Sequence, residues 1–266
     1  MSYSLLPSPP ANRNAPPAPD AGRIRRGALT SDALAELQIA AQRLFGSGVA
    51  VAVTNPSLRG GMLMPAEEPA VARAAPSRRR EFAAGRAAAR RAIADLDQPN
   101  CAIPKGPGGA PVWPPGITGS ISHCDTACIA VASQARRFAS LGVDVEVAAP
   151  LDPVLTDIIC SESELVRIAR LPARRQALMA TMIFSAKEAA YKCQFPLTGH
   201  LFDFNGFEIG LDLRQRRFTA TFATGNQVFP KGYSIEGRYA ITEGLIVTAA
   251  RLRQSDLPAT ARETRQ

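Results

Sequence analysis

The stretch Leu141-Gly-Val-Asp-Val-Glu-Val147 alternates apolar and acidic residues and is the most informative part of the chain. A period of two is typical of a β-strand with one buried face. The apolar side chains would share that face, and Asp144 and Glu146 would share the other, with Cα atoms about 6.5–7 Å apart. Because like charges repel at this distance, we expect a partner such as Mg²⁺, which prefers oxygen ligands. A half-exposed strand that shows two acids to solvent is the alternative.

A second informative stretch is Phe184-Ser-Ala-Lys-Glu-Ala-Ala-Tyr-Lys192. Glu188 and Lys192 are four residues apart and share one face of a helix, with Lys187 beside Glu188. The pair could be a simple surface ion pair. In the functional interpretation, Glu188 is a third carboxylate on the metal, and Lys187 and Lys192 hold phosphate oxygens.

Two further segments could contact a ligand. Gly119-Ser-Ile-Ser-His123 carries one of the two histidines of the chain at a strand end, although a lone histidine is often structural. Gly106-Pro-Gly-Gly109 lies in a loop rich in Gly and Pro. This loop lacks the Gly-Lys-Ser/Thr sequence of a Walker-type phosphate loop. Its backbone could still approach a flat ligand closely.

The overall composition is that of a globular protein. The chain has 266 residues, of which 46% are hydrophobic and 20% charged, which excludes a wholly disordered chain, a collagen and a coiled coil. No apolar run is long enough for a membrane helix, and we expect no secretory signal, because a basic stretch followed by an apolar core is missing from the first residues. The odd number of cysteines, five, indicates reduced thiols and a cytoplasmic protein.

The charge is unevenly distributed. With 31 Lys and Arg against 23 Asp and Glu, the formal net charge is +8, so the surface attracts anions. Seven arginines and one acid, Glu81, lie between Arg73 and Arg91, which predicts a phosphate platform or a solvated basic helix face. Aromatic residues make up only 6% and do not alternate with basic ones, which disfavours nucleic-acid binding.

The order of patterns predicts an α+β fold, with two similar halves as one arrangement of it. We expect a disordered Pro-rich leader (1–28), an N-terminal half (29–135), a C-terminal half with the metal site (136–254) and a polar tail (255–266). Expected helices are 31–45, 76–95, a short helix that starts at the capping box Ser161–Glu164, and 173–194, which would stop before Pro196. Expected strands are 49–53, 117–122, 128–133, 138–147, 207–213, 218–222, 233–240 and 245–252.

Taken together and in order, five motifs resemble one family. They are Glu-Phe-x-x-Gly-Arg from Glu81, Gly-Ala-Pro-Val-Trp-Pro from Gly109, Gly-Ser-Ile-Ser-His from Gly119, Gly-Val-Asp-Val-Glu from Gly142 and Phe-Ser-x-Lys-Glu-Ala-x-Tyr-Lys from Phe184. The chain resembles the Sfp/EntD-type 4'-phosphopantetheinyl transferases from about residue 47 to 252, and most of all their EntD-like bacterial branch.

The resemblance implies a reaction and a fold. Such enzymes move the 4'-phosphopantetheine group of coenzyme A to a serine of an acyl, peptidyl or aryl carrier protein and release 3',5'-ADP. The fold is pseudo-dimeric, with two similar α/β halves and the coenzyme in the cleft between them. The cofactor would be Mg²⁺ or Mn²⁺, and the macromolecular partner an acidic carrier protein, without nucleic acid or membrane. A monomer is the default.

The resemblance also implies site residues. The metal ligands would be Asp144, Glu146 and Glu188, with a backbone contact from Val145. Asp144, Glu188 and Lys192 would be catalytic, and Glu188 is the candidate base for the serine proton. Residues implied to contact the coenzyme are Arg78, Arg86, Lys105, Gly108, Gly109, Ala110, Pro111, Ser122, His123, Lys187 and Lys192.

One departure from the family pattern concerns the loop. Relatives often carry a basic residue at or just before the positions of Gly108, Gly109 and Ala110, where the nearest cation here is Lys105. Either Lys105 reaches the phosphate, or coenzyme binding is weaker. Three alternatives stay open: another Mg²⁺-dependent phosphotransferase or nuclease with the same acids, a basic nucleic-acid-binding module, and a family member that binds coenzyme A without activity.

Overall fold

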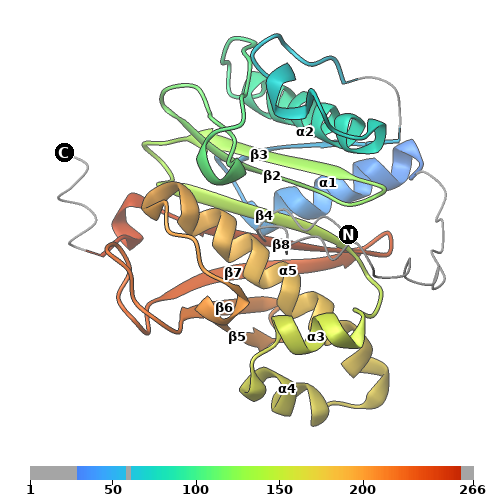
Figure 1. The fold of residues 1–266 in the computed structure, drawn as a ribbon, viewed down its shortest axis with the longest axis vertical. Coiled ribbons are helices and arrows are strands. Elements are labelled where there is room, and N and C mark those ends of the chain that lie inside the picture. The colour runs from blue at the N-terminus through green and yellow to red at the C-terminus, as the bar shows by residue number, and fades with distance from the viewer. Residues whose placement is uncertain (1–28, 58–60, 259–266) are drawn as a thin grey trace.

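The computed structural model describes residues 29–57 and 61–258 as an α+β fold with two antiparallel sheets (Figure 1). The predicted leader, residues 1–28, and residues 259–266 of the predicted tail lie outside the described residues. The helices are α1 (Ser31–Phe45), α2 (Pro76–Ala94), α3 (Pro153–Ile159), α4 (Glu162–Ala169) and α5 (Ala173–Thr198). The strands are β1 (Ala50–Thr54), β2 (Ile117–His123), β3 (Cys128–Gln134), β4 (Ser140–Val147), β5 (Phe207–Asp212), β6 (Arg217–Phe222), β7 (Ser234–Thr242) and β8 (Leu245–Leu252).

The first sheet has the strand order β1-β3-β2 and is covered on one face by α2. Helix α2 begins with Pro76 at its first turn, where a missing N–H costs nothing, and continues through alanines that favour a helix. Ala88, Ala89 and Ala92 are fully buried against small strand residues such as Ala130. Small side chains on both elements let α2 lie close to the sheet.

The second sheet has the order β4-β8-β7-β6-β5, and α5 packs on one face of it. The close approach of α5 to β4 depends on Gly142, because a Cβ there would lie 1.9 Å from the carbonyl oxygen of Ala189. Ala186, Ala189 and Cys193 line the buried side of α5 without bulky groups. The bare backbone of Gly142 therefore allows side chains of α5 to reach those of β4.

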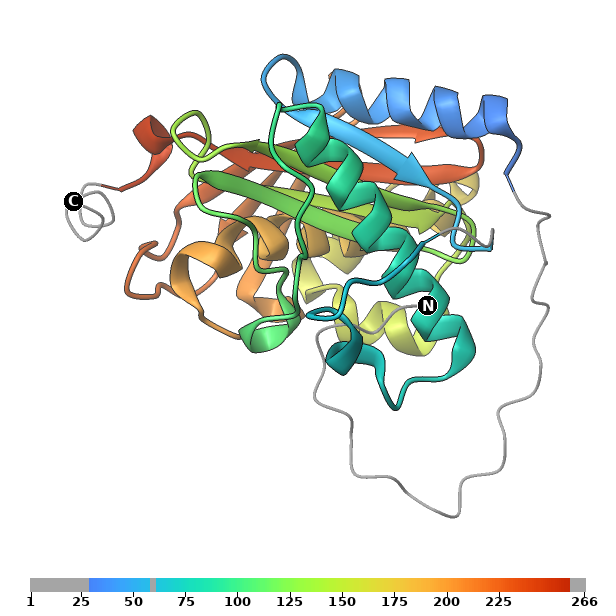
Figure 2. The same ribbon diagram turned by 90° about the horizontal axis from the view of Figure 1, so that it is seen from above.

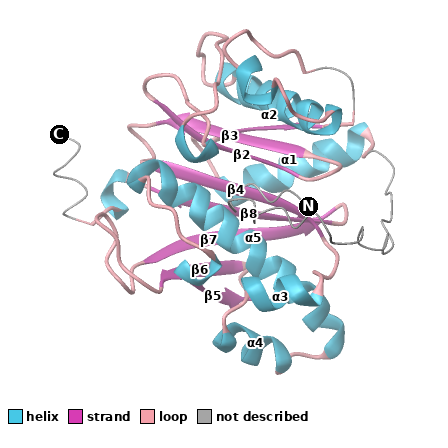
Figure 3. Cartoon of the chain, viewed as in Figure 1, coloured by secondary structure: helices cyan, strands magenta, loops and turns pink. Residues whose placement is uncertain are grey.

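The two sheets meet where β2 lies beside β4. The backbone N–H of Val143 donates to Oγ of Ser120 at 3.1 Å, which joins the two strands. Helix α1 runs along the side of the sheets opposite α2 and α5 (Figure 2). Its Leu37 and Phe45 share one core with Leu141 and Val143 of β4 and with residues of β1 and β8. A common core beneath α1 thus holds the two halves together. On the opposite side, α2 and α5 border the sheets (Figure 3).

The strand and helix pattern agrees closely with the expected one, and the capping box of Ser161 and Glu164 is present at the start of α4. The expectation that the long helix stops before Pro196 is wrong, since α5 continues to Thr198. Proline in the last turn removes only one backbone hydrogen bond. The helix ends instead at Gly199, whose φ of 61° is left-handed and whose N–H donates to the carbonyl of Phe195 at 2.8 Å.

One helix was not expected. In α3, Pro153 occupies the first turn and the carboxylate of Asp152 caps it by accepting from the N–H of Val154 at 2.8 Å. Its seven residues are too few for a clear helical period. None of the helices in the described part of the chain combines the length and hydrophobicity needed to cross a bilayer.

Candidate active site

A cavity of about 160 Å³ opens between the two halves, where β2 meets β4. Its walls come from α2, from the Gly/Pro loop before β2, from the ends of β2 and β4, and from α5. Eleven of the residues singled out in the sequence line it: Arg78, Arg86, Lys105, Gly109, Pro111, Ser122, His123, Asp144, Glu146, Glu188 and Lys192. Segments far apart in the sequence thus converge on one cleft.

The α2 wall carries two arginines. Arg86 is only 5% exposed, its Nε donates to the carbonyl of Ile103 at 2.6 Å, and its guanidinium lies 4.1 Å above the ring of Phe82. Burial lowers the pKa of Arg86 to about 10, which still leaves it charged at neutral pH. Arg78 contacts Nε2 of His123. This wall therefore presents positive charge to the cleft.

His123 is neutral in this setting. Burial, with a smaller contribution from the nearby charges of Arg78 and Lys192, lowers the pKa of its ring to about 4. A neutral imidazole can accept a hydrogen bond from Arg78. The carboxylate of Glu81 lies 3.8 Å from Nε2 of His123 and 3.4 Å from Arg78. Glu81 thus pairs with Arg78 and lies beside His123 at the cavity rim, a position that the sequence analysis missed.

The loop wall combines one cation with backbone. Lys105 is exposed, lines the cavity and pairs with Pro111 in an isolated β-bridge. Gly109 has a φ of 85°, so an L side chain would be strained there. Gly108 and Ala110 do not line the cavity, and a Cβ at Gly108 would collide with the ring of Phe195. Lys105, the cation that the sequence analysis considered for this loop, borders the cleft.

The acidic centre lies at the base of the cavity. Asp144 is 2% exposed, and its carboxylate accepts hydrogen bonds from Ser122 and Ser185, both at 2.8 Å, and from Lys192 Nζ at 2.6 Å. Lys192 Nζ also lies 3.8 Å from Oε2 of Glu188. One ammonium therefore faces a cluster of three carboxylates, since Glu146 lines the same cavity.

The charges of this cluster are out of balance. Burial, with the nearby charge of Asp144, raises the pKa of Glu188 to about 7, although Lys192 opposes the shift. Burial and Asp144 also raise the pKa of Glu146 well above its usual range. Lys192 has a raised pKa because the attraction of Asp144 and Glu188 outweighs its burial. A second cation would relieve the repulsion among the carboxylates.

The donor chemistry of Asp144, Glu146 and Glu188 fits a hard divalent cation, although their present spacing does not form a metal site. Their donors are all carboxylate oxygens, the ligands that Mg²⁺ and Mn²⁺ prefer. As they stand, no three acidic, His or Cys side chains within residues 29–57 and 61–258 converge closely enough to hold a metal ion. The ammonium of Lys192 lies between Asp144 and Glu188, the position that a cation would take.

Lys187 is not at this cavity. It is 2% exposed, and its Nζ forms an ion pair with Glu164 at 2.8 Å and donates to the carbonyl of Ile159 at 2.8 Å. The expectation that Lys187 contacts the coenzyme does not agree with this position. Residues five apart on an α-helix point about 140° away from each other, so Lys187 and Lys192 cannot both face the cleft.

Val145 contributes only its backbone to this region. Its side chain is fully buried in the core below α1, and its backbone pairs with Val247 of β8. The role of Val145 as a metal contact stays a prediction.

Ser185 was missed by the sequence analysis although a signal was available. It is fully buried and donates to Asp144, and its hydroxyl also lies 2.9 Å from that of Thr248. Ser185, Glu188 and Lys192 are spaced i, i+3 and i+7, which places all three on one stripe of α5. A search of the helix for polar residues at that spacing would have found it.

The chain is similar to one group of enzymes. The family model for the 4'-phosphopantetheinyl transferase N-terminal domain matches residues 66–133, and the model for the 4'-phosphopantetheinyl transferase superfamily matches residues 140–243. 4'-Phosphopantetheinyl transferase Svp of Streptomyces mobaraensis is 39% identical over 71% of this chain and 78% of its own length. Npt of Nocardia iowensis is 36% identical over 70% of this chain and 87% of its own length. PptT of Mycobacterium tuberculosis is 33% identical over 70% and 84%.

The likeness to the EntD-like branch is more distant than the sequence motifs suggested. Enterobactin synthase component D of Salmonella typhimurium is 36% identical, but over only 43% of this chain and 47% of its own length. The similarity to Svp, Npt and PptT covers more of the chain.

Proposed function

This chain belongs to the 4'-phosphopantetheinyl transferases, enzymes that modify carrier proteins, and we propose that it takes the phosphopantetheine group from coenzyme A, attaches it to a carrier serine and releases 3',5'-ADP. The observation that carries the proposal is the convergence of Asp144, Glu146 and Glu188 with cations of α2 and α5 on one cavity. Acids suited to a metal and cations suited to phosphates are the two parts that transfer from a pyrophosphate needs.

The coenzyme's phosphates would bind to cations on both sides of the cleft. Arg78 and Arg86 of α2 face Lys192 of α5 across the cavity, and Lys105 lies at its rim. Arg86 is held by the carbonyl of Ile103 and by the ring of Phe82, so little side-chain entropy is lost when it binds phosphate. Ser122 and His123 would contact the 3'-phosphate region, and Gly109 and Pro111 would lie along the adenine.

Asp144, Glu146 and Glu188 would hold Mg²⁺ or Mn²⁺ against the pyrophosphate. When bound, the cation would neutralise charge on the phosphate oxygens and stabilise the leaving 3',5'-ADP. Ser122 and Ser185 each donate to a different oxygen of Asp144, so this carboxylate is fixed in orientation. A fixed ligand needs no reorganisation during the reaction.

Glu188 is our candidate for the group that takes the proton from the carrier serine. It lies on the same stripe of α5 as Lys192 and borders two cavities, the cleft and a small hollow of about 30 Å³ beside Tyr191 and Phe202. Its position at the junction lets it face the coenzyme on one side and an incoming hydroxyl on the other.

The partner we propose is an acidic carrier protein of the acyl, peptidyl or aryl type. The net charge of +8 would speed its encounter with such a protein and make the association weaken with salt. One relative is named as a component of enterobactin synthase, and another is named only as a 4'-phosphopantetheinyl transferase. Siderophore, polyketide and peptide carriers are therefore all consistent with the family. We propose action as a monomer in the cytoplasm.

The test is direct modification of a carrier. Purified protein is incubated with coenzyme A, Mg²⁺ and an apo acyl carrier protein, and the carrier is weighed by mass spectrometry. We expect the mass gain of one phosphopantetheine group per carrier, lost when Mg²⁺ is chelated and when the carrier serine is replaced by alanine. A carrier that stays unmodified would overturn the proposal and favour another Mg²⁺-dependent phosphotransferase or nuclease, or a family member that binds coenzyme A without activity.

A further inference from the structure

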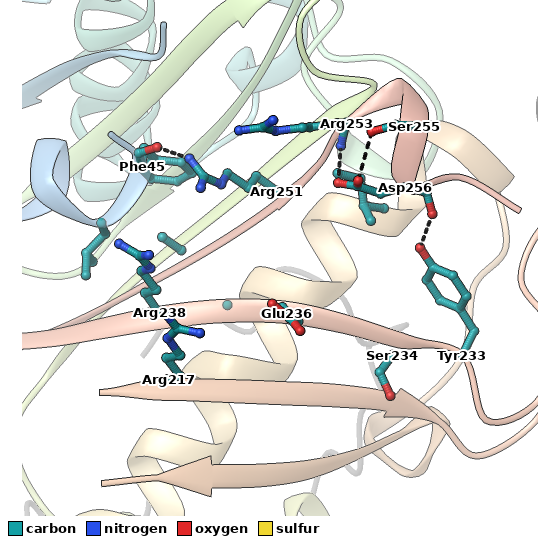
Figure 4. Close-up of a pocket in the computed structure, with 14 residues that line it drawn as sticks. Phe45, Arg217, Tyr233, Ser234, Glu236, Arg238, Arg251, Arg253, Ser255 and Asp256 are labelled. Carbon is teal, nitrogen blue, oxygen red and sulfur yellow. Dashed lines mark hydrogen bonds between the residues drawn. The ribbon is translucent and has the colours of Figure 1, made fainter. Parts of the chain in front are cut away.

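A second basic hollow lies on the other side of the molecule from the cleft. It has a volume of about 490 Å³ and lies between the end of α1 and the face of β6, β7 and β8 that α5 does not cover (Figure 4). Side chains alternate across these strands: Phe218 and Ile235 pack toward α5, and Arg217 and Arg238 face the hollow. We call this hollow the arginine groove; it shares no lining residue with the transferase cleft.

Two exposed arginines form its centre. Arg217 of β6 and Arg238 of β7 are direct cross-strand partners in the antiparallel ladder, and their side chains lie next to each other in Figure 4. Like charges in this arrangement destabilise a sheet unless a counter-charge is present. Among the described residues, neither guanidinium forms an ion pair with an acid.

Two more arginines extend the positive charge along β8. Arg251 is half-buried and its Nη1 donates to the carbonyl of Phe45 at the end of α1, which fixes its position (Figure 4). Arg253 lies close to Arg251, and both guanidinium groups lie about 6 Å from the ring of Phe138. Burial, with the charges of Arg238 and Arg253, lowers the pKa of Arg251, so a bound anion would stabilise its charged form.

The two acids of the groove do not neutralise this cluster. The carboxylate of Asp256 accepts from the backbone N–H of Arg253 at 2.8 Å and from the hydroxyl of Ser255 at 3.0 Å, and its backbone carbonyl accepts from Tyr233. Glu236 lies farther along β7, away from the paired guanidinium groups (Figure 4). Four arginines thus face two carboxylates, one of which is held by a local turn.

The positive charge continues toward α1. A neighbouring hollow of about 480 Å³ shares Arg217 and Arg238 with the groove and adds Arg43 and Arg216, with Glu36 as the acid. Arg216 has a φ of 54°, a left-handed conformation in which turns usually place Gly or Asn. An arginine at this position costs local strain and places a further cation at the same surface.

The chemistry of the groove favours phosphate over other anions. Its cations are all arginines, whose planar forks bind phosphate oxygens in pairs. Of its apolar residues, Phe45, Ala249 and Leu252 are buried and only Leu44 is half-buried, so the groove offers few anchors for peptide side chains. Tyr233 stands at one end, and its ring already packs against Phe229 with centroids 4.9 Å apart, which disfavours its use as a platform for stacked bases.

We propose that the arginine groove is a binding site for an oligophosphate anion, with Arg217 and Arg238 holding one phosphate group and Arg251 and Arg253 the next. The site lies outside the transferase cleft and does not depend on the proposed coenzyme chemistry.

The test is isothermal titration of the full chain with inorganic tripolyphosphate in buffer without divalent cations, which would bind the titrant. The same titration of Arg78→Gln, a cation of the cleft, separates binding in the cleft from binding in the groove. The double variant R217Q/R238Q removes the paired forks at exposed positions. The matched control R174Q/R175Q removes the same charge from two adjacent exposed arginines at the start of α5. We expect tripolyphosphate affinity to fall at least about tenfold in R217Q/R238Q and to be unchanged in the control.

Several results would overturn the proposal. Equal weakening in both double variants would mean that only net charge matters. Hexaglutamate binding as tightly as tripolyphosphate, with the same dependence on Arg217 and Arg238, would assign the groove to acidic peptides. Sedimentation of the protein with phosphatidylglycerol vesicles, without binding of free tripolyphosphate, would assign it to lipid headgroups. Carrier modification by R217Q/R238Q should stay normal, so a failed titration and a failed transferase assay are separate outcomes.

Discussion

Helix α5 carries two lysines, Lys187 and Lys192, that meet carboxylates in very different surroundings. Lys187 is 2% exposed and faces Glu164, whose other hydrogen bonds come from the backbone N–H groups of Ser161 and Ile209 at 2.8 and 2.7 Å. One cation meets one anion, and every oxygen of that anion is satisfied. Lys187 borders the same small hollow of about 30 Å³ that Glu188 lines, but its ammonium is held by Glu164 and not by the acids of the cleft.

Lys192 is 20% exposed and faces three carboxylates at the edge of a cavity of about 160 Å³. Burial and the charge of Asp144 raise the pKa of Glu188 to about 7. Lys187, by contrast, meets the single carboxylate of Glu164. The comparison indicates that the number of carboxylates around each lysine, together with burial, distinguishes the balanced ion pair of Lys187 from the proposed site at Lys192. Substitutions at each lysine and its carboxylates test that distinction.

The largest effect is expected from Lys187→Met. Removing one partner of a buried ion pair leaves Glu164 charged and unpaired, which costs about 3–5 kcal/mol of folding free energy. Urea unfolding followed by circular dichroism measures it. We expect the rate of carrier modification per folded molecule to stay near that of the wild type. A variant of normal stability that modifies carriers more than tenfold more slowly would place Lys187 in the reaction.

The next effect is that of Asp144→Asn, which keeps the shape of the side chain and removes its charge. We expect kcat/KM for carrier modification to fall by about 10²–10³-fold, since a group that stabilises the transition state is lost. Stability should fall less than in Lys187→Met, because Glu188 remains as an anion beside Lys192 and the amide can accept from one of the two serines and donate to the other. Glu208→Gln, at an acid outside the cleft, is the control. Normal turnover by Asp144→Asn would remove the metal assignment.

A smaller effect is expected from Gly142→Ala, which tests the contact that brings α5 to β4. The new Cβ would lie 1.9 Å from the carbonyl oxygen of Ala189, so the helix must move, at a cost of about 1–3 kcal/mol. Stability and turnover should fall together, because the ion pairs of Lys187 with Glu164 and of Lys192 with Asp144 both depend on the position of α5. Gly210→Ala is the matched control, since its Cβ meets only the side chain of Thr219. Equal losses in both variants would contradict the account.

The smallest effect is expected from the double variant K187M/E164Q. Removing both charges leaves no unpaired ion, so stability should return to within about 1 kcal/mol of the wild type. The amide oxygen of the substituted side chain can still accept from the N–H of Ile209. The comparison with Lys187→Met in the same urea series gives the coupling energy. A double variant as unstable as the single one would show that the pair does more than balance charge.

Local patterns explain why most elements could be predicted. The alternation in Leu141–Val147 places valines on one face and acids on the other, as found in β4. The capping box of Ser161 and Glu164 marks the start of α4 as expected. The end of α5 could not be predicted in the same way. A proline in the last turn loses a single hydrogen bond, and the packing of the helix against the sheet outweighs that cost.

The sequence by itself determined that acids share one face of a strand and that Glu188 and Lys192 share one face of a helix, because these follow from the periods of two and of 3.6 residues. Only the tertiary structure decided which lysine meets which carboxylate. Lys187 and Lys192 differ by about 140° around the helix, and nothing local says which direction leads to Asp144 and which to Glu164. That choice depends on residues brought together from β4 and α4, where burial and charge act between segments distant in the chain.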